Sequence, residues 1–238
     1  MQSYQTVFQR REIKYLLNIE QYATLMGQLE TYMKPDRFAE ARVNSLYYDT
    51  EDYRLIRASL DKPVYKEKLR LRTYGVTTQE SMAFVELKKK YRGIVYKRRI
   101  AMPLMDAYAY LAGTYKPANE EQIHHEIDWF LQFYKPSPAV RLSYDRIAFT
   151  GREDDGVRVT FDSNLRWQSD ALRLESREPG FNLLPPTAYL MEVKVPDAVP
   201  LWLCNLLDRL AVYPMSFSKY GTYYKEQVLG KNGVLVCA

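Results

Sequence analysis

The segment KEKLRLR at residues 66–72 carries a cation at every second position. In a β-strand, side chains at alternate positions point to one face of the sheet, and their neighbours point to the other. The alternation therefore predicts a strand over residues 66–74 with Leu69 and Leu71 on its apolar face. The opposite face is basic and carries Lys66, Lys68, Arg70 and Arg72.

Five further segments show charged and apolar residues alternating in a similar way, least cleanly at 95–100, where Arg98 falls on the other face. They are REIKY at 11–15, FVELKKK at 84–90, VYKRRI at 95–100, VRVTFD at 157–162 and MEVKV at 191–195. Their charged faces carry Glu12, Lys14, Glu86, Lys88, Lys90, Lys97, Arg99, Arg158, Asp162, Glu192 and Lys194. A sheet with one face in water explains any single strand of this kind, but like charges opposite each other across a ladder repel. Six such strands therefore favour a concave basic surface with a few embedded carboxylates.

This basic surface suggests a ligand that contains phosphate groups. Arginine binds phosphate oxygens in a bidentate manner, and lysine binds them as a point charge. Carboxylates among the cations suit a hard divalent cation that bridges phosphates. Glu12 and Glu86 fit equally well as counter-ions for the basic residues, so both roles stay open for them.

The composition is that of a soluble globular protein. Of the 238 residues, 47% are hydrophobic and 26% are charged, and no Pro- or Gly-rich linker divides the chain. We therefore expect a single domain over residues 1–238. The net charge of +5 favours an anionic partner. Neither an apolar run of about 18 residues nor a secretory signal is visible, so we expect a cytoplasmic protein with no membrane segment of its own, while a membrane partner stays open.

Periodicity along the chain predicts the secondary structure. Strands are expected at residues 9–17, 43–48, 66–74, 82–90, 95–102, 139–150, 157–163 and 188–195. Helices are expected after Asn18, where Gln21 completes a capping box, after Asp49, and at residues 104–114, 120–134 and 200–210. Most strands follow one another along the chain, which indicates an α+β fold with a mainly antiparallel sheet.

Several catalytic motifs are absent from the sequence. It contains neither the Walker phosphate loop nor the dinucleotide-binding glycine motif, and it has only 10 glycines. The two histidines, His124 and His125, are adjacent, so general catalysis by histidine is not expected. Most Tyr and Phe residues lie opposite the charged positions or in helices, where they fit core packing better than stacking on bases. A nucleic-acid partner is therefore not expected.

Eight short motifs follow one another at regular places in the chain. They are EIK at 12–14, LYYD at 46–49, LRLRTYG at 69–75, VELKK at 85–89, SYDRIAF at 143–149, RVTFD at 158–162, MEVKV at 191–195 and FSKYG at 217–221. Their order and spacing resemble the VTC domain, the catalytic domain of vacuolar transporter chaperone polyphosphate polymerases, within the triphosphate tunnel metalloenzyme superfamily. The resemblance implies a closed antiparallel β-barrel with helices outside. It also implies a basic tunnel that binds triphosphate or polyphosphate with Mn²⁺ or Mg²⁺.

The resemblance assigns roles to individual residues. It implies phosphate binding and charge neutralisation during catalysis by Arg70, Arg72, Lys88, Arg146 and Arg158. It implies further substrate contacts by Lys14, Lys97, Tyr144 and Lys219, and metal binding by Glu192. Glu12 and Glu86 are additional candidates for metal binding or water activation. Arg10 stands where the superfamily signature Glu-x-Glu-x-Lys has its first glutamate, so two metal-binding carboxylates from this strand are not implied.

The possible functions differ in what happens to the bound phosphates. The first is a metal-dependent phosphotransferase, similar to a polyphosphate polymerase, that acts on nucleoside triphosphate and inorganic polyphosphate. Phosphoryl transfer mainly needs positioning and charge stabilisation, so no covalent nucleophile is required. The alternatives are a metal-dependent tripolyphosphatase or nucleoside triphosphatase, with Glu12 or Glu86 acting on water, and a polyphosphate-binding module without turnover. The sequence leaves the donor nucleotide and the product length open.

Overall fold

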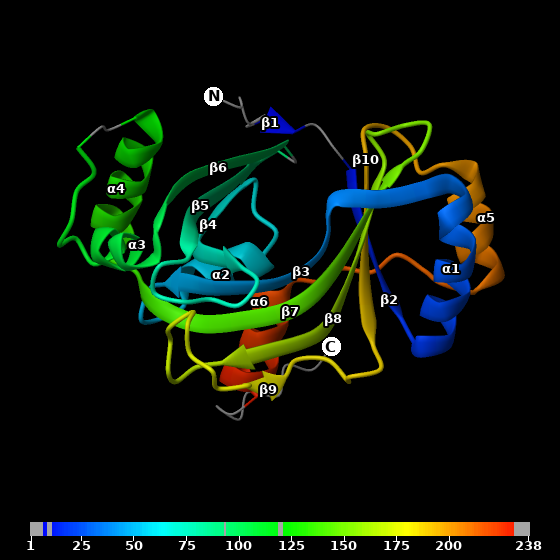
Figure 1. Cartoon of the computed structure of the whole chain (residues 1–238). Helices are drawn as coiled ribbons and strands as arrows, with labels where there is room; N and C mark the ends of the chain where they lie inside the picture. The colour runs from blue at the N-terminus through cyan, green and yellow to red at the C-terminus, as the bar shows by residue number, and fades with distance from the viewer. Residues whose placement is uncertain (1–6, 9–10, 93, 119–120, 231–238) are drawn as a thin grey trace.

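One antiparallel sheet lies at the centre of the protein (Figure 1). The computed structural model describes residues 7–8, 11–92, 94–118 and 121–230. These residues form a 10-stranded sheet in the order β1-β6-β5-β4-β3-β7-β8-β10-β2, with β9 paired to β8. The strands are β1 (Val7–Phe8), β2 (Arg11–Leu17), β3 (Met33–Asp49), β4 (Tyr65–Tyr74), β5 (Met82–Tyr91), β6 (Ile94–Pro103), β7 (Ser137–Gly151), β8 (Arg158–Gln168), β9 (Phe181–Asn182) and β10 (Tyr189–Val195). The helices are α1 (Ile19–Tyr32), α2 (Arg54–Leu60), α3 (Leu104–Leu111), α4 (Gln122–Tyr134), α5 (Leu201–Arg209), α6 (Lys219–Tyr223) and a π-helical segment at Tyr224–Leu229.

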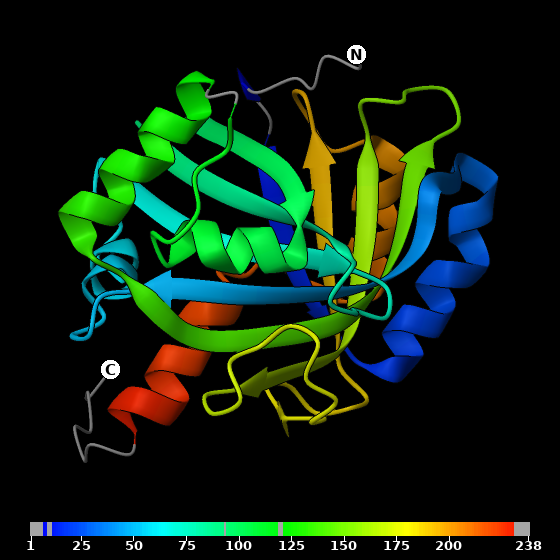
Figure 2. The same ribbon diagram turned by 60° about the vertical axis from the view of Figure 1, so that its left-hand side comes forward.

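The sheet is strongly curved, but the described strand pairs do not close it into a barrel. β1 and β2 lie at the two ends of the pairing order, and no pair joins them among the described residues. The α+β class with an antiparallel sheet is therefore confirmed, and the closed barrel is not. Residues 9–10, which include Arg10, lie outside the described residues. The curvature gives the sheet a concave side, here called the inner face, and a convex outer face (Figure 2).

Two apolar clusters cover the outer face. The first packs β4, β5 and β6 against α3 and α4, with Leu69 and Ile127 fully buried. The second packs β2, β8 and β10 against α1 and α5, with Val193 and Leu203 fully buried. These side chains lie on the apolar sides of the alternating segments. The charged sides of the same strands consequently point to the inner face.

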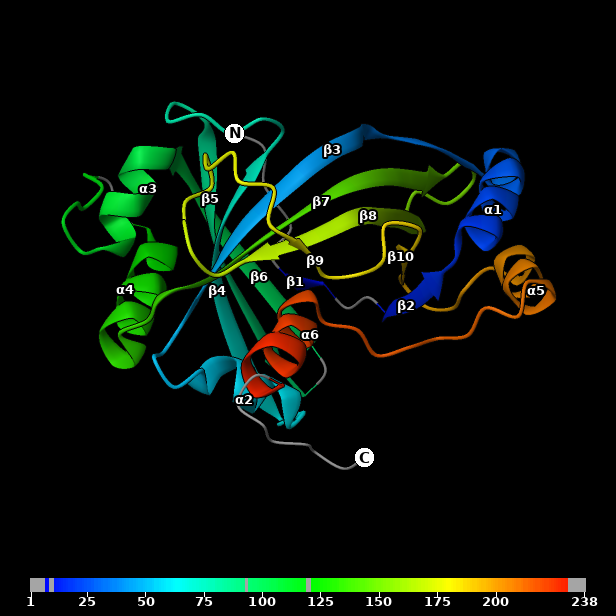
Figure 3. The same cartoon turned by 90° about the horizontal axis from the view of Figure 1, so that it is seen from below.

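A third apolar cluster lies at one end of the inner face. Tyr47 of β3 is directly opposite Arg70 of β4 and Val140 of β7, and directly opposite residues of a sheet share a face. Tyr220 and Tyr223 of α6 belong to the same cluster as Tyr47. α6 lies beside α2 (Figure 3). These two helices therefore cover one end of the inner face.

The predicted start of α1 is confirmed. The Asn18 side chain accepts a hydrogen bond from the Gln21 backbone, and the Gln21 side chain accepts one from the Asn18 backbone. Both bonds satisfy N–H groups that lack a partner within the helix. The start of α2 differs from a simple cap because Asp49 lies upstream of the helix. Its carboxylate accepts the backbone N–H groups of Leu55 and Ile56.

β3 is longer than the sequence predicts, because it begins at Met33 rather than at residue 43. Residues 33–42 lack a regular alternation, and the pairing of this part with β7 shifts register between Pro35 and Glu40. A bulge of this kind interrupts the period of two on which strand prediction depends. The unpredicted half of β3 carries Asp36, which meets a residue of the candidate site.

Candidate functional site on the inner face

Charged side chains from most strands of the sheet meet on the inner face. The pairing register sets residues of neighbouring strands directly opposite each other: Lys14 with Glu192, Lys68 with Lys88, Lys88 with Lys97, Arg70 with Glu86, and Arg146 with Asp162. We call these residues, together with Glu12, Arg72, Tyr144 and Lys219, the inner cluster. It includes each of the predicted site residues except Arg158.

The Glu86 side chain is only 1% exposed, and among the carboxylates of the inner cluster only Asp162 is more enclosed. Its Oε2 accepts a hydrogen bond from Arg70 Nε at 2.7 Å, and its Oε1 lies 2.7 Å from Lys97 Nζ. Arg72 Nη1 lies 3.9 Å from Oε2. Burial alone would raise the pKa of Glu86, but these three cations hold it well below its usual value. The geometry therefore favours a role as counter-ion rather than as metal ligand or base.

Three lysines form a row across β4, β5 and β6. Lys68 is directly opposite Lys88, which is directly opposite Lys97. Burial lowers the pKa of all three, to about 8 for Lys68 and for Lys97. Among the described residues, Lys88 has no carboxylate within 4.0 Å. The row therefore holds positive charge that the described part of the protein does not neutralise.

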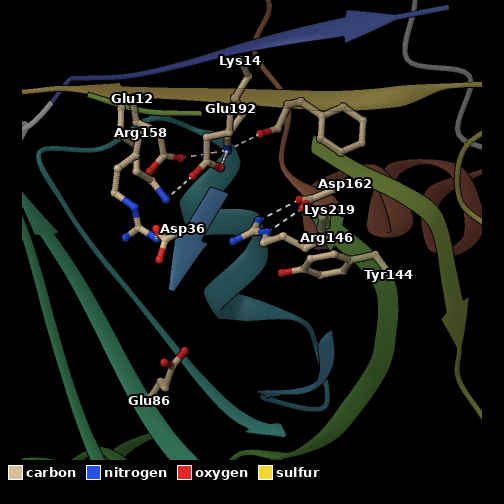
Figure 4. Close-up of polar contacts among 12 residues, drawn as sticks. Glu12, Lys14, Asp36, Glu86, Tyr144, Arg146, Arg158, Asp162, Glu192 and Lys219 are labelled. Atoms are coloured by element: carbon tan, nitrogen blue, oxygen red, sulfur yellow. Dashed lines mark hydrogen bonds and ion pairs between the residues drawn. The ribbon is translucent and has the colours of Figure 1, made fainter. Parts of the chain in front are cut away.

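Asp162 organises a second group on β7 and β8. Arg146 donates two hydrogen bonds to it, from Nε at 2.6 Å and from Nη2 at 2.8 Å (Figure 4). Lys219 of α6 donates a third at 2.5 Å, and its Nζ lies 4.4 Å from the ring centroid of Tyr144. Burial alone would raise the pKa of Asp162, but Lys219 and Arg146 lower it. The alternation in RVTFD placed Asp162 on the charged face, yet nothing local to it indicated these partners.

Lys14 lies between two carboxylates (Figure 4). Its Nζ is 3.2 Å from Glu12 Oε1 and 3.9 Å from Glu192 Oε2, and it donates a hydrogen bond to the Phe217 carbonyl at 3.0 Å. Burial would lower the pKa of Lys14, but Glu12 and Glu192 raise it. Glu192 also pairs with Lys194 at 2.5 Å. Burial would raise the pKa of Glu192, but its cationic neighbours hold it well below its usual value.

The carboxylates of the inner cluster fit a metal site in which the protein supplies one or two ligands and substrate and water supply the others. Within the described ranges, no group of three or more His, Cys, Asp or Glu side chains is arranged to hold a metal. Glu12 and Glu192 do converge on Lys14, and the buried Thr160 hydroxyl directly opposite Glu192 has no hydrogen-bond partner there. Mg²⁺ in phosphate-binding sites commonly uses one or two carboxylates and takes its other ligands from substrate and water. Glu12 and Glu192 fit that pattern, whereas Glu86 lies apart from them (Figure 4).

Two tyrosines contribute hydroxyl groups to the inner cluster. Arg70 Nη1 donates to the Tyr47 hydroxyl at 3.1 Å, and Arg72 Nη2 donates to the Tyr144 hydroxyl at 3.3 Å. Burial would raise the pKa of Tyr47, but the nearby cations lower it to about 7. Burial and cations compete in the same way at Tyr144, and its pKa is also lowered. Tyr47 was not predicted as a site residue, although it stands in the LYYD motif two residues before Asp49.

The segment from Met215 to Tyr220 crosses the inner face and positions Lys219. The Met215 backbone donates to the Lys14 carbonyl at 2.8 Å, and Lys68 Nζ lies 3.5 Å from the Ser218 hydroxyl. The buried Tyr220 donates to Asp49 at 2.7 Å. These contacts join β2, β4 and β3 through a segment far away in sequence.

Arg158 lies at the margin of the inner cluster. Its Nη2 is 2.6 Å from Asp36 Oδ2, and its side chain is 40% exposed. The alternation placed Arg158 on the charged face correctly. No pattern in the sequence revealed Asp36, because it lies in the irregular half of β3.

Two hollows lie outside the inner cluster. One, of about 420 Å³, is lined by residues of α2, α4 and β4 that include Glu67 and Tyr134. The other, of about 440 Å³, is lined by residues between Gln168 and Phe181. Neither is lined by a residue of the inner cluster, so the candidate site is identified by its converging charges. In the described part of the chain, no helix is long and apolar enough to cross a membrane.

Comparisons of the sequence with known proteins cover nearly the same range as the eight motifs. Residues 9–227 match the VTC domain family. Subunit 4 of the vacuolar transporter chaperone complex from Trypanosoma cruzi is 21% identical over 267 residues, which cover 90% of this chain and 33% of that protein. Subunit 4 from Schizosaccharomyces pombe is 28% identical over 148 residues, which cover 53% of this chain and 20% of that protein. The chain thus spans about a third or less of the length of these relatives.

A solved structure shares the fold. A candidate adenylate cyclase from Bacillus halodurans superposes with a TM-score of 0.58 at 14% identity, over 90% of this chain and 96% of that one. At this level of identity the likeness concerns the arrangement of the sheet and helices alone.

Proposed function

Because the chain belongs to the VTC domain family, we propose that its inner cluster binds triphosphate or polyphosphate chains and transfers phosphoryl groups between them. The row formed by Lys68, Lys88 and Lys97 carries this proposal. Lys97 pairs with Glu86, but the half-buried Lys68 and Lys88 have no carboxylate within 4.0 Å among the described residues. Enclosing such unpaired cations is unfavourable unless an anion joins them. A phosphate chain supplies negative charge at regular intervals, which suits cations repeated across neighbouring strands.

The residues of the inner cluster have different roles in the proposed phosphoryl transfer. Arg70 and Arg72 neutralise the charge that develops on the transferred group, and the lysine row holds the rest of the chain. The Tyr144 hydroxyl donates a hydrogen bond to a phosphate oxygen. Arg146 and Lys219, both fixed by Asp162, bind the chain near Tyr144, while Arg158 contacts it from the margin. The acceptor is the terminal phosphate of another chain, so the protein needs no nucleophile of its own.

Glu192 and Glu12 are the residues that would hold Mn²⁺ or Mg²⁺. When bound, the metal would supply positive charge that stabilises the phosphate chain. Lys14, which lies between the two carboxylates, keeps them oriented. Glu86 is not part of this proposed metal site, because its three cationic partners already occupy it.

A hydrolase is the second candidate function. Glu12 has a side chain that is 32% exposed, so it can reach water as well as Lys14. A carboxylate in that position can accept a proton from an attacking water molecule. The enclosed Glu86 is not suited to this role.

Incubation of the purified protein with ATP and Mn²⁺ tests the proposal, with ADP release measured and polyphosphate examined on a gel. ADP release together with polyphosphate supports the phosphotransferase. ADP and inorganic phosphate without polymer support the hydrolase. Tripolyphosphate binding without any turnover identifies a binding module. The cytoplasmic location and a membrane partner remain predictions that need the intact protein in cells.

A further inference from the structure

Two aromatic side chains extend the inner face beyond its charged part. Phe84 of β5 is directly opposite Arg72 of β4, so both lie on the inner face. Tyr74 of β4 follows Arg72 at the next position on the same side. The Tyr74 ring meets the Phe84 ring edge-on, with centroids 5.8 Å apart and planes at 70°.

Arg99 completes this group. Arg99 lies on β6, directly opposite Glu86 of β5. Its guanidinium carbon is 4.7 Å from the centroid of the Phe84 ring. The resulting pair is a flat guanidinium beside a flat aromatic ring, at the edge of the inner cluster. Cation–π contacts of this type are favourable in themselves, and both surfaces also stack on other planar groups.

Core packing does not account for Tyr74 and Phe84. Neither residue belongs to any of the three apolar clusters of the described residues. Tyr74 is 42% exposed and Phe84 is half-buried, whereas Tyr47 and Tyr48 of β3 are buried. Leaving aromatic surface in water forgoes the favourable free energy of burial, so this surface is available for a ligand.

The spacing suits a nucleotide. Phe84 and Lys88 are four positions apart on β5, which corresponds to about 13 Å along a strand. The segment from Met215 to Tyr220 crosses the inner face near Lys68, so it covers the end away from Phe84. A nucleoside triphosphate whose phosphates contact Lys88 and Arg70 can therefore extend its base along β5 toward Phe84, away from the covered end.

We propose that Phe84, Arg99 and Tyr74 form a stacking site for the base of a nucleoside triphosphate bound to the inner cluster. The base stacks on the Arg99–Phe84 pair, and Tyr74 borders it. This inference rests on the proposed function, and it makes a nucleotide, rather than inorganic polyphosphate, the preferred donor. Stacking accepts any base because every base has a π-face, so affinity follows stacking strength and purines bind more tightly than pyrimidines.

The test compares ATP with methyl triphosphate, which is also a triphosphate monoester but has no base. Dissociation constants are measured by isothermal titration at one salt and one Mn²⁺ concentration, for the wild type, Phe84→Leu and Phe133→Leu. Phe133 is the matched control, because it is 53% exposed on α4 and has the Arg54 guanidinium 5.6 Å from its ring, far from the inner face. Thermal unfolding of each variant checks that it is folded.

We expect the wild type to bind ATP at least about fivefold more tightly than methyl triphosphate, which corresponds to the low end of base-stacking energies. Phe84→Leu should remove most of this preference and change the affinity for methyl triphosphate less than twofold, while Phe133→Leu changes neither. Equal wild-type affinities for the two ligands overturn the base site and leave the proposed function intact, and this comparison stands even when Phe84→Leu does not fold. If Phe84→Leu lowers the affinity for ATP and for methyl triphosphate by the same factor, the base site is also overturned. Failure of the wild type to bind either ligand overturns both proposals.

Discussion

Strands β4, β5 and β6 carry charged residues on both of their faces, and the two faces differ in how far these charges are paired within the protein. On the outer face, Lys89 and Arg98 both contact Glu126 of α4. On the same face, the buried Glu67 accepts hydrogen bonds from the hydroxyl groups of Tyr65 and Tyr134. Each outer charge therefore has a partner on a neighbouring element, and together they attach α4 to the sheet.

On the inner face, cations outnumber carboxylates. Arg70, Arg72 and Lys97 share the single carboxylate of Glu86, and the half-buried Lys88 has no carboxylate nearby among the described residues. Repulsion between these cations costs stability in the free protein. Sequences tolerate such local conflicts mainly at functional sites. The contrast indicates that the charges on the outer face stabilise the fold, whereas the excess positive charge on the inner face favours binding of an anionic ligand.

Removal of both inner arginines tests this contrast most severely. We expect Arg70→Ala/Arg72→Ala to weaken tripolyphosphate binding by about 100-fold or more, because each contact to a charged group contributes about 1.5–3 kcal/mol. Isothermal titration at fixed salt measures the loss. The outer-face control Arg98→Ala should change the affinity less than twofold. Unchanged affinity in the folded double variant would remove the basis for placing the ligand on the inner face.

Glu86→Gln should destabilise the protein by about 3–5 kcal/mol at pH 7, the cost of breaking a buried ion pair from one side. Glu126→Gln, whose side chain is 21% exposed on the outer face, should cost at most about 1 kcal/mol. Urea unfolding measures both. Because the folded-state pKa of Glu86 lies below its unfolded value, its contribution is present above the ordinary carboxyl pKa and disappears as the pH falls through the lowered pKa. The stability difference between wild type and Glu86→Gln should therefore shrink on acidification, and a constant difference from pH 7 to pH 3 would contradict the assignment.

Lys219→Ala should weaken tripolyphosphate binding by about 1.5–3 kcal/mol, because it removes a cation that Asp162 holds over the Tyr144 ring. Lys219→Arg should restore only part of this, since a planar guanidinium does not replace a point charge in a confined space. Lys225, exposed in the π-helical segment that follows α6, provides the control, and Lys225→Ala should stay within about 0.5 kcal/mol. Equal effects of Lys219→Ala and Lys225→Ala would show that Lys219 belongs with the solvated charges.

Glu192→Gln separates metal binding from phosphate binding on the same face. We expect metal-dependent turnover to fall by at least about tenfold, as for changes around other metal sites, with a smaller change in tripolyphosphate affinity measured without metal. A Mn²⁺ titration of the turnover rate measures the first effect. Wild-type activity at every Mn²⁺ concentration would make Glu192 a counter-ion of Lys14 and Lys194.

The smallest expected effect concerns pH. The pKa values of Lys68 and Lys97 are lowered to about 8 in the free protein, so both lose charge as the pH rises from 7 to 9. A polyanion binds their protonated forms, so tripolyphosphate affinity should fall over this interval, by less than about tenfold for each lysine. Lys68→Arg, which stays charged, should make the fall shallower. An outer-face change such as Lys89→Arg should leave the pH profile as it is.

The sequence predicted most members of the inner cluster, and it did so through a local rule. Lys14, Arg70 and Glu192 were assigned to a common polar surface because alternation decides the face of each strand residue. The resemblance added Lys219 from a distant motif. Asp36 and Tyr47 were missed, because a register shift obscured the first and an apolar-looking motif contained the second. Asp162 was placed on the correct face without a role.

The sequence by itself determined which side of each strand is charged, since side-chain direction in a strand follows from a period of two residues. It also determined the start of α1, where Asn18 and Gln21 satisfy each other within one turn. Only the tertiary structure decided that Glu86 meets three cations, that Lys219 meets Asp162, and that the described strand pairs leave the sheet open. These features depend on strand order, register and curvature, which arise from pairings between residues far apart in the chain. No local pattern carries that information.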